Sequence, residues 1–157
     1  MGEESEKERL NRNLDQLLQE LRIVIPGVQV LFAFLLAVPF ATGFERVDPF
    51  ERVVFFVAML FAALAVVLLL APSIQHRILF RLEQKEYLIR SGSLLTIAGM
   101  TALAVSMTLS LSLVSHVLYG LWAALIAGAI SLVGFATIWY VIPLGRRARA
   151  ERAHGDP

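Results

Sequence analysis

The sequence contains no cysteine, and only 17% of its 157 residues are charged. Without a thiol, the chain can form no disulfide, offer no thiolate nucleophile and bind no zinc or iron through cysteine. Soluble domains usually have about 25% charged and about 45 to 50% apolar residues, whereas 57% of the side chains here are hydrophobic. The composition therefore favours a membrane protein over a soluble domain.

The sequence also lacks the patterns that carry common enzyme chemistry. It has no His-Glu-x-x-His pair, no glycine-rich phosphate loop and no Gly-x-Ser-x-Gly turn. Its three histidines, His76, His116 and His154, fall in separate connections and in the tail, so they cannot gather into a metal site within one chain. We therefore expect a protein that is not an enzyme, needs no cofactor and binds no nucleic acid.

Long runs without charge dominate the chain. They extend over Ile23–Phe44, Val53–Gln75 and Ser91–Gly145, with His116 as the one basic side chain in the third run. Because about 20 apolar residues cross the hydrocarbon core, the first two runs hold one span each and the third holds two. The stretch "SHVLYG" suits a turn between the last two. The predicted spans are residues 24–41, 53–71, 94–114 and 118–142.

Leucines in the N-terminal tail recur on one helical face, which is typical of an amphipathic helix; they are Leu10, Leu14, Leu17, Leu18 and Leu21. Such a helix either lies in the membrane interface or extends the first span into the cytosol. Pro26 lacks a backbone donor, so a kink is expected there. The predicted fold is all-α, a four-helix transmembrane bundle with an N-terminal cytoplasmic amphipathic helix.

Three segments follow from this reading. Residues 1–22 form a cytoplasmic tail with the amphipathic helix, residues 23–145 form the four-span membrane domain, and residues 146–157 form a basic cytoplasmic tail. Pro72 and Pro143 stand before basic residues at the ends of the second and fourth spans, where they are expected to help end each span.

Lysine and arginine are unevenly distributed between the connections. The N-terminal tail, the second loop and the C-terminal tail each carry four, whereas the first loop carries two and the third loop carries none. The positive-inside rule therefore predicts a multi-pass protein of the inner membrane with both termini in the cytoplasm. The lipid bilayer is its first expected partner.

Small residues recur on one face of the predicted third and fourth spans. Such residues let helix backbones approach closely in lipid, and we expect these faces to pack; they contain Gly99, Ala102, Ser106 and Ser110, then Gly120, Ala124, Ala127, Ser131 and Gly134. Ala58, Ala62 and Ala65 share a face of the second span. A path lined by the hydroxyls of Thr96, Ser106, Thr108, Ser110 and Ser112 is the alternative, although such hydroxyls commonly bond to their own helix.

Polar residues flank the start of the first span. Glu20, Arg22 and Gln29 are candidates for a transport site at a cytoplasmic mouth, or they are interface anchors. In a continuous helix, Asp15, Arg22 and Gln29 would form a polar stripe with heptad spacing. Exchange of a cation for protons ordinarily needs a carboxylate inside the membrane, and none of the thirteen acids lies within a predicted span.

The stretches "LLQELRIVIPGVQVLFAFLLAVPF" and "LLLAPSIQHRILFR" resemble a family of small bacterial four-span membrane proteins classified as a domain of unknown function. The resemblance covers residues 11–147, and members usually have a glutamine and a small polar residue where this chain has Ile25 and Pro26. Some members carry the label sodium/proton antiporter, so the resemblance implies cation/proton exchange as one hypothesis. A lipid-surface role for the basic amphipathic segments is another.

The function expected first is non-enzymatic. Insertion and helix packing account for the residues described above, so we expect the protein to act by packing with a second copy or with a membrane protein partner. The alternative is a small cation/proton antiporter or channel that uses Glu20, Arg22 and Gln29.

Overall fold

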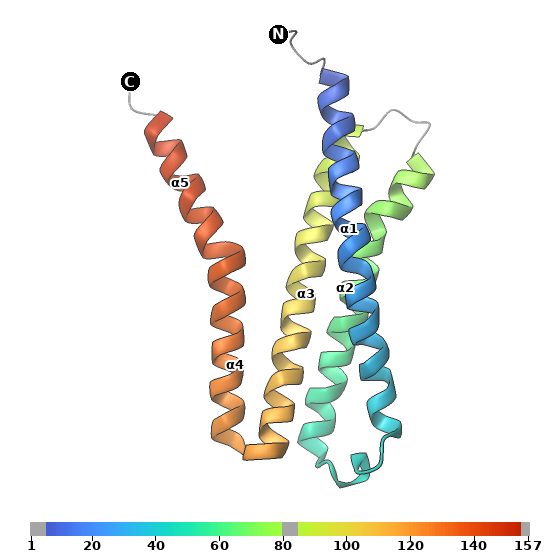
Figure 1. The fold of residues 1–157 in the computed structure, drawn as a ribbon, viewed down its shortest axis with the longest axis vertical. Coiled ribbons are helices and arrows are strands. Elements are labelled where there is room, and N and C mark those ends of the chain that lie inside the picture. The colour runs from blue at the N-terminus through green and yellow to red at the C-terminus, as the bar shows by residue number, and fades with distance from the viewer. Residues whose placement is uncertain (1–5, 80–84, 155–157) are drawn as a thin grey trace. The chain divides into compact units, whose positions relative to one another are not determined.

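The computed structural model describes residues 6–79 and 85–154, and the regular elements within those residues are all helices. Four helices are long and apolar enough to cross a membrane (Figure 1). The chain is therefore an all-α, four-helix membrane protein, as the uncharged runs predict. It divides into two compact units, Met1–Ser106 and Met107–Pro157, and helix α3, Lys85–Tyr119, passes from the first unit into the second.

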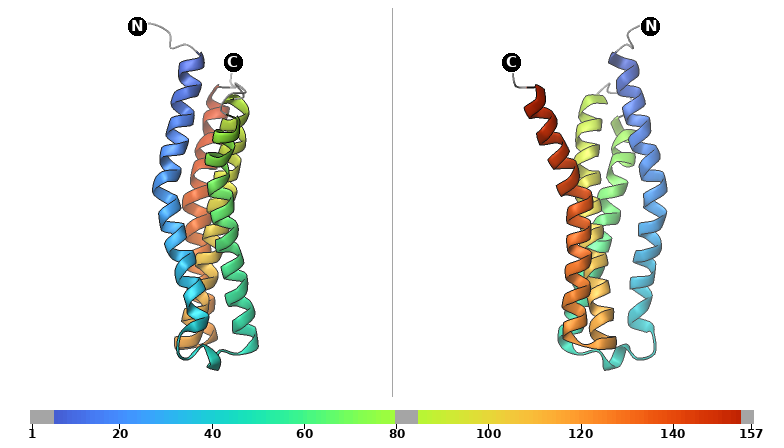
Figure 2. Two further views of the ribbon diagram at one scale, coloured as in Figure 1. Left: turned by 90° about the vertical axis from the view of Figure 1, so that its right-hand side faces the viewer. Right: turned by 60° about the vertical axis from the view of Figure 1, so that its left-hand side comes forward.

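Helix α1, Glu6–Ala37, joins the amphipathic segment to the first predicted span without interruption. Its buried side chains recur every seven residues, at Leu14, Leu21, Val28 and Leu35. Heptad spacing of this kind keeps one edge of a helix against its neighbour, and α1 runs beside the second helix in Figures 1 and 2. Because Leu14 and Leu21 are buried, the amphipathic segment is an extension of the first span.

The connection after α1 contains two short 3-10 helices, Val38–Phe40 and Phe44–Arg46. Helix α2, Pro49–Leu79, then begins with a capping box. The Glu51 N–H donates to the Asp48 carboxylate at 2.8 Å, and the Asp48 N–H donates to the Glu51 carboxylate at 3.0 Å. This exchange satisfies backbone donors that would otherwise lack partners at the helix start. These two acids therefore have a structural role.

Helix α2 forms the centre of the first unit. Its buried residues alternate at spacings of three and four, which gives a continuous seam of Phe55, Ala58, Ala62, Ala65, Leu69 and Pro72. Leu69 and Ala65 join Leu21 and Val28 of α1 and Ala102 of α3 in one apolar cluster. The small alanine side chains let the three helices approach closely. The first unit is thus a three-helix core made by α1, α2 and the first part of α3.

The second unit is a helical hairpin. Helix α3 ends at Tyr119, and Gly120 turns the chain with a φ of 84° that favours glycine. The turn therefore falls inside the predicted "SHVLYG" stretch. Helix α4, Leu121–Ala136, runs back beside the second part of α3 (Figure 2), with the hydroxyls of Thr108 and Ser131 3.0 Å apart. A π-helical turn, Thr137–Val141, leads into helix α5, Ile142–His154.

The prolines do not end their helices, contrary to the expectation for Pro72 and Pro143. Helix α2 continues beyond Pro72 to Leu79, and α1 likewise continues through Pro26. Neighbouring helices in a membrane protein can compensate for the lost hydrogen bond, and Pro72 is buried in the α2 seam. Pro143 directly follows the π-helical turn Thr137–Val141 and Ile142, and α5 continues beyond it to His154.

Candidate functional site

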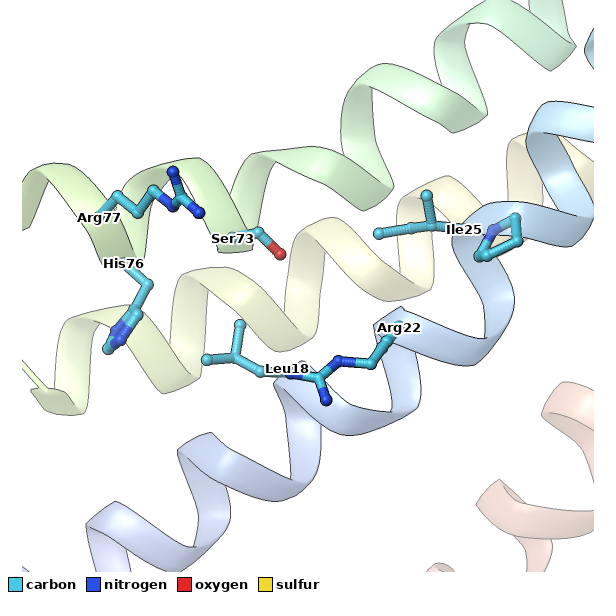
Figure 3. Close-up of a pocket in the computed structure, with 7 residues that line it drawn as sticks. Leu18, Arg22, Ile25, Ser73, His76 and Arg77 are labelled. Carbon is cyan, nitrogen blue, oxygen red and sulfur yellow. The ribbon is translucent and has the colours of Figure 1, made fainter.

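A groove of about 390 Å³ opens between α1 and α2 (Figure 3). Its α1 wall contains one cation and three apolar side chains, and its α2 wall contains two ionisable side chains and a hydroxyl. The lining residues are Leu18, Arg22, Ile25 and Pro26 from α1, and Ser73, His76 and Arg77 from α2. The groove therefore combines positive charge with an apolar wall.

Helical spacing explains how these side chains meet. Ser73, His76 and Arg77 stand at positions i, i+3 and i+4 of α2, so they project from one face. Figure 3 shows Arg22 extending from α1 beside Leu18, opposite that face. Because α1 packs against α2 along its heptad seam, the two faces border the same space.

The electrostatics of the groove are one-sided. None of the described residues that line it carries a carboxylate. Within the described residues, neither the Arg22 nor the Arg77 guanidinium forms a hydrogen bond or an ion pair. The Ser73 hydroxyl likewise has no hydrogen bond to any residue that the structure describes. Uncompensated guanidinium groups of this kind attract an anion and repel a cation.

The structure separates the three candidate residues on α1. Arg22 lines the groove, whereas Glu20 and Gln29 are exposed and lie outside its lining. Glu20 precedes Arg22 by two positions, which places the two side chains about 200° apart around the helix. Gln29 lies on the Arg22 side but about 10 Å further along the axis. The three residues do not form one site.

Helix α1 is continuous from Glu6 to Ala37, so the polar stripe that was predicted for a continuous helix is present. Asp15, Arg22 and Gln29 each follow a buried seam residue by one position, and all three are exposed. The stripe therefore borders the contact between α1 and α2 and does not enter it. Arg22 is the one member that takes part in the groove.

The small residues of α3 in the first unit are helix contacts. Ser106 and Ala102 are buried, and a Cβ atom on Gly99 would lie 2.8 Å from Leu69 Cγ. The Ser106 hydroxyl donates to the Ala58 carbonyl at 2.8 Å. These side chains therefore join α3 to the face of α2 that carries its alanines.

The small residues of the second unit are less covered. On α3, the Ser110 hydroxyl is buried and has no hydrogen-bond partner among the described residues. The stripe on α4 is half-buried at each of its positions, which are Gly120, Ala124, Ala127, Ser131 and Gly134. Ser131 bonds to Thr108, and a Cβ atom on Gly128, beside the stripe, would lie 2.5 Å from Ser112 Oγ. One edge of the stripe therefore faces α3.

Three of the five hydroxyls that could line a path form bonds within the protein. Thr96 donates to the Gly92 carbonyl of its own helix, and Ser106 donates to α2. The hydroxyls of Thr108 and Ser131 bond to each other. These bonds occupy hydroxyls that a hydrated path would need for water or ions.

The groove residues on α2 were only partly apparent from the sequence. Arg77 is one of the four basic residues of the second loop, whereas Ser73 and His76 have no predicted role in the sequence. The sequence could have identified Ser73 and His76 through their spacing, because it places them on the same helical face as Arg77. The partner, Arg22, becomes apparent only once the rotation of α1 against α2 is known.

Among the described residues, no three carboxylate or histidine side chains gather where they could hold a metal ion.

In the part of the chain that the structure describes, four helices are long and apolar enough to cross a membrane, and they define the class, which is the α-helical integral membrane proteins. Residues 3–143 match the family of unknown function DUF6328, and the chain belongs to that family. No curated protein and no solved structure matches the chain.

Proposed function

We propose that this protein is a non-enzymatic protein of the inner membrane that works through helix association, with a second copy of itself or with another membrane protein. The observation that carries the proposal is the edge of the small-residue stripe on α4 that α3 leaves uncovered within the second unit. A Cβ atom on Gly134 would meet no atom within 4 Å in the described structure. Small residues in membrane helices are favoured where another backbone comes close.

The geometry of α4 separates its two edges. Ser131 and Gly128 contact α3 through Thr108 and Ser112, so they mark the edge that the hairpin covers. At 3.6 residues per turn, Gly134 lies about 60° away from Ser131 on the other side of the stripe. A helix that carries glycine on a face open to lipid gains nothing from lipid contact, whereas an approaching helix gains van der Waals contact there.

The membrane placement is part of the same proposal. The charge distribution supports cytoplasmic termini, and four crossings would bring both ends to the same side. Transport through Glu20, Arg22 and Gln29 is less well supported, because Glu20 lies on a different side of α1 from the other two.

The test is a pair of leucine substitutions on α4. Gly134→Leu places a large side chain on the uncovered edge, whereas Ala129→Leu adds similar bulk on the opposite side, where Ala129 is exposed. Leucine is a good helix former, so neither change is expected to break α4 itself. Chemical cross-linking in membranes and blue native electrophoresis of the purified protein report association with a partner and with a second copy, respectively.

We expect the wild type and Ala129→Leu to give the same associated species and Gly134→Leu to lose it. A wild type that is monomeric after purification and forms no cross-link in membranes would overturn the proposal. Equal loss in both variants would also contradict it, because the effect would then not depend on the small-residue edge.

A further inference from the structure

We propose that the groove between α1 and α2 binds the phosphate group of an anionic phospholipid, with Arg22 and Arg77 as its charged ligands and Ser73 and His76 as additional polar contacts. This inference depends on α1 and α2 crossing the membrane, but not on helix association. The ligand class follows from the level of the groove in the membrane, from its positive charge and from its apolar wall.

The groove lies at the level where both helices change from charged to uncharged sequence. On α1, Arg22 is the last charged residue before the run Ile23–Phe44. On α2, the uncharged run Val53–Gln75 ends immediately before His76 and Arg77. Since α1 and α2 are consecutive antiparallel helices, these two boundaries meet at the same end (Figure 1). That level corresponds to the membrane interface, where lipid phosphates are found.

The charges in the groove match a phosphate. A guanidinium presents a planar fork of donors that suits a phosphate with two parallel hydrogen bonds. Arg22 and Arg77 line the groove from different helices, and no described residue of the lining carries a carboxylate. The Ser73 hydroxyl provides a further donor, because it has no bond to any residue within 6–79 and 85–154. Among the described residues that line the groove, a cation would find no ligand with negative charge.

The apolar wall distinguishes a lipid from a free anion. Ile25 and Pro26 lie on the membrane side of Arg22, within the uncharged run. Leu18 lies about one helical turn before Arg22, on the side away from the membrane. A phosphate ion dissolved in water gains nothing from these side chains, whereas the glycerol backbone and the start of an acyl chain would bury apolar surface against them. The volume of about 390 Å³ is within the range of small-molecule sites.

Native mass spectrometry of the full-length protein in detergent tests the inference. Phosphatidylglycerol, phosphatidylcholine and inorganic phosphate are added in separate titrations. The variant Arg22→Gln/Arg77→Gln removes both cations from the groove, and Arg149→Gln/Arg152→Gln removes the same charge from exposed positions on α5. Ser73→Met keeps both arginines but fills the groove. Circular dichroism checks that each variant is as helical as the wild type.

We expect one tightly bound phosphatidylglycerol per chain and binding at least about tenfold weaker in the groove variant, because each arginine near an anionic headgroup contributes about 1 kcal/mol. Ser73→Met should weaken binding as well, and the α5 variant should not. If the groove variant does not fold, Ser73→Met decides the outcome. Equal binding of phosphatidylcholine, equal loss in the α5 variant, or competition by inorganic phosphate at lipid-like concentrations would each overturn the inference.

Discussion

The hydroxyl of Ser106 on α3 donates a hydrogen bond of 2.8 Å to the backbone carbonyl of Ala58 on α2. Ser106 is fully buried, and Ala58 is 1% exposed. The carbonyl already belongs to the backbone ladder of α2, so the serine adds a second bond to it without interrupting the helix. Such a contact is possible because alanine leaves the backbone of α2 accessible to a neighbouring side chain.

Replacing Ser106 with alanine should destabilise the first unit by about 0.6 kcal/mol, the average measured for hydrogen bonds between membrane helices, and by no more than about 1.7 kcal/mol. The loss should be small, because alanine leaves no buried polar group on α3 and the Ala58 carbonyl keeps its helical partner. Unfolding of the purified protein in mixed detergent, followed by circular dichroism, measures the change.

Ser115→Ala is the matched control for this experiment. The Ser115 hydroxyl donates to the Leu111 carbonyl of its own helix at 2.8 Å, so its removal breaks no contact between helices. We expect little change in the unfolding free energy. If Ser115→Ala lowered the unfolding free energy as much as Ser106→Ala does, the hydrogen bond from Ser106 to α2 would not stabilise the protein more than a bond within one helix.

Two glycines in membrane helices should respond in opposite ways to the same substitution. A Cβ atom on Gly99 would lie 2.8 Å from Leu69 Cγ and 3.2 Å from Leu68 Cβ, whereas a Cβ atom on Gly27 would meet nothing within 4 Å. Gly99→Leu should therefore lower the unfolding free energy by about 1 to 3 kcal/mol through overpacking. Gly27→Leu should leave it unchanged or raise it by up to about 1 kcal/mol, because leucine favours a helix more than glycine does.

The same detergent titration measures both glycine variants. Retention of stability in Gly99→Leu would show that α3 moves away from Leu69 at little cost, and the close approach of α2 and α3 would then not be a requirement of the fold.

Much of the fold follows from local pattern, because a membrane helix needs a long apolar run and every backbone bond made within itself. The uncharged runs predicted the four helices, and the "SHVLYG" stretch predicted the turn that Gly120 makes. The prolines were harder to interpret. A proline inside a helix of a soluble protein usually kinks or breaks it, but α2 continues through Pro72, which is buried.

The candidate site could be predicted less well, because it depends on how two helices are rotated about their axes. Glu20, Arg22 and Gln29 are close in sequence, yet only Arg22 faces the groove. Its neighbours there, Ser73 and His76, are about 50 positions away along the chain. The heptad seam at Leu14, Leu21, Val28 and Leu35 fixes that rotation, and sequence inspection of charged residues alone does not reveal it.

Membrane orientation can be tested by labelling, since the chain has no native cysteine. Glu45 lies in the connection before α2 and Arg149 lies on α5, and both are exposed. We expect Glu45→Cys to react with an impermeant thiol reagent from outside the cell and Arg149→Cys to react only after the membrane is opened. Labelling of both cysteines in intact cells would contradict cytoplasmic termini.

Proteoliposomes test whether the polar residues at the start of the first span carry ions. We expect no sodium- or potassium-driven proton flux above that of empty liposomes, because exchange needs a carboxylate at a shielded site. Glu20 is exposed and lies about 200° around α1 from Arg22, outside the groove. Glu20→Gln and Gln29→Leu should accordingly match the wild type. Flux that requires the protein and disappears in Glu20→Gln would instead make Glu20 a transport residue, and the helix-association proposal would have to give way to cation exchange.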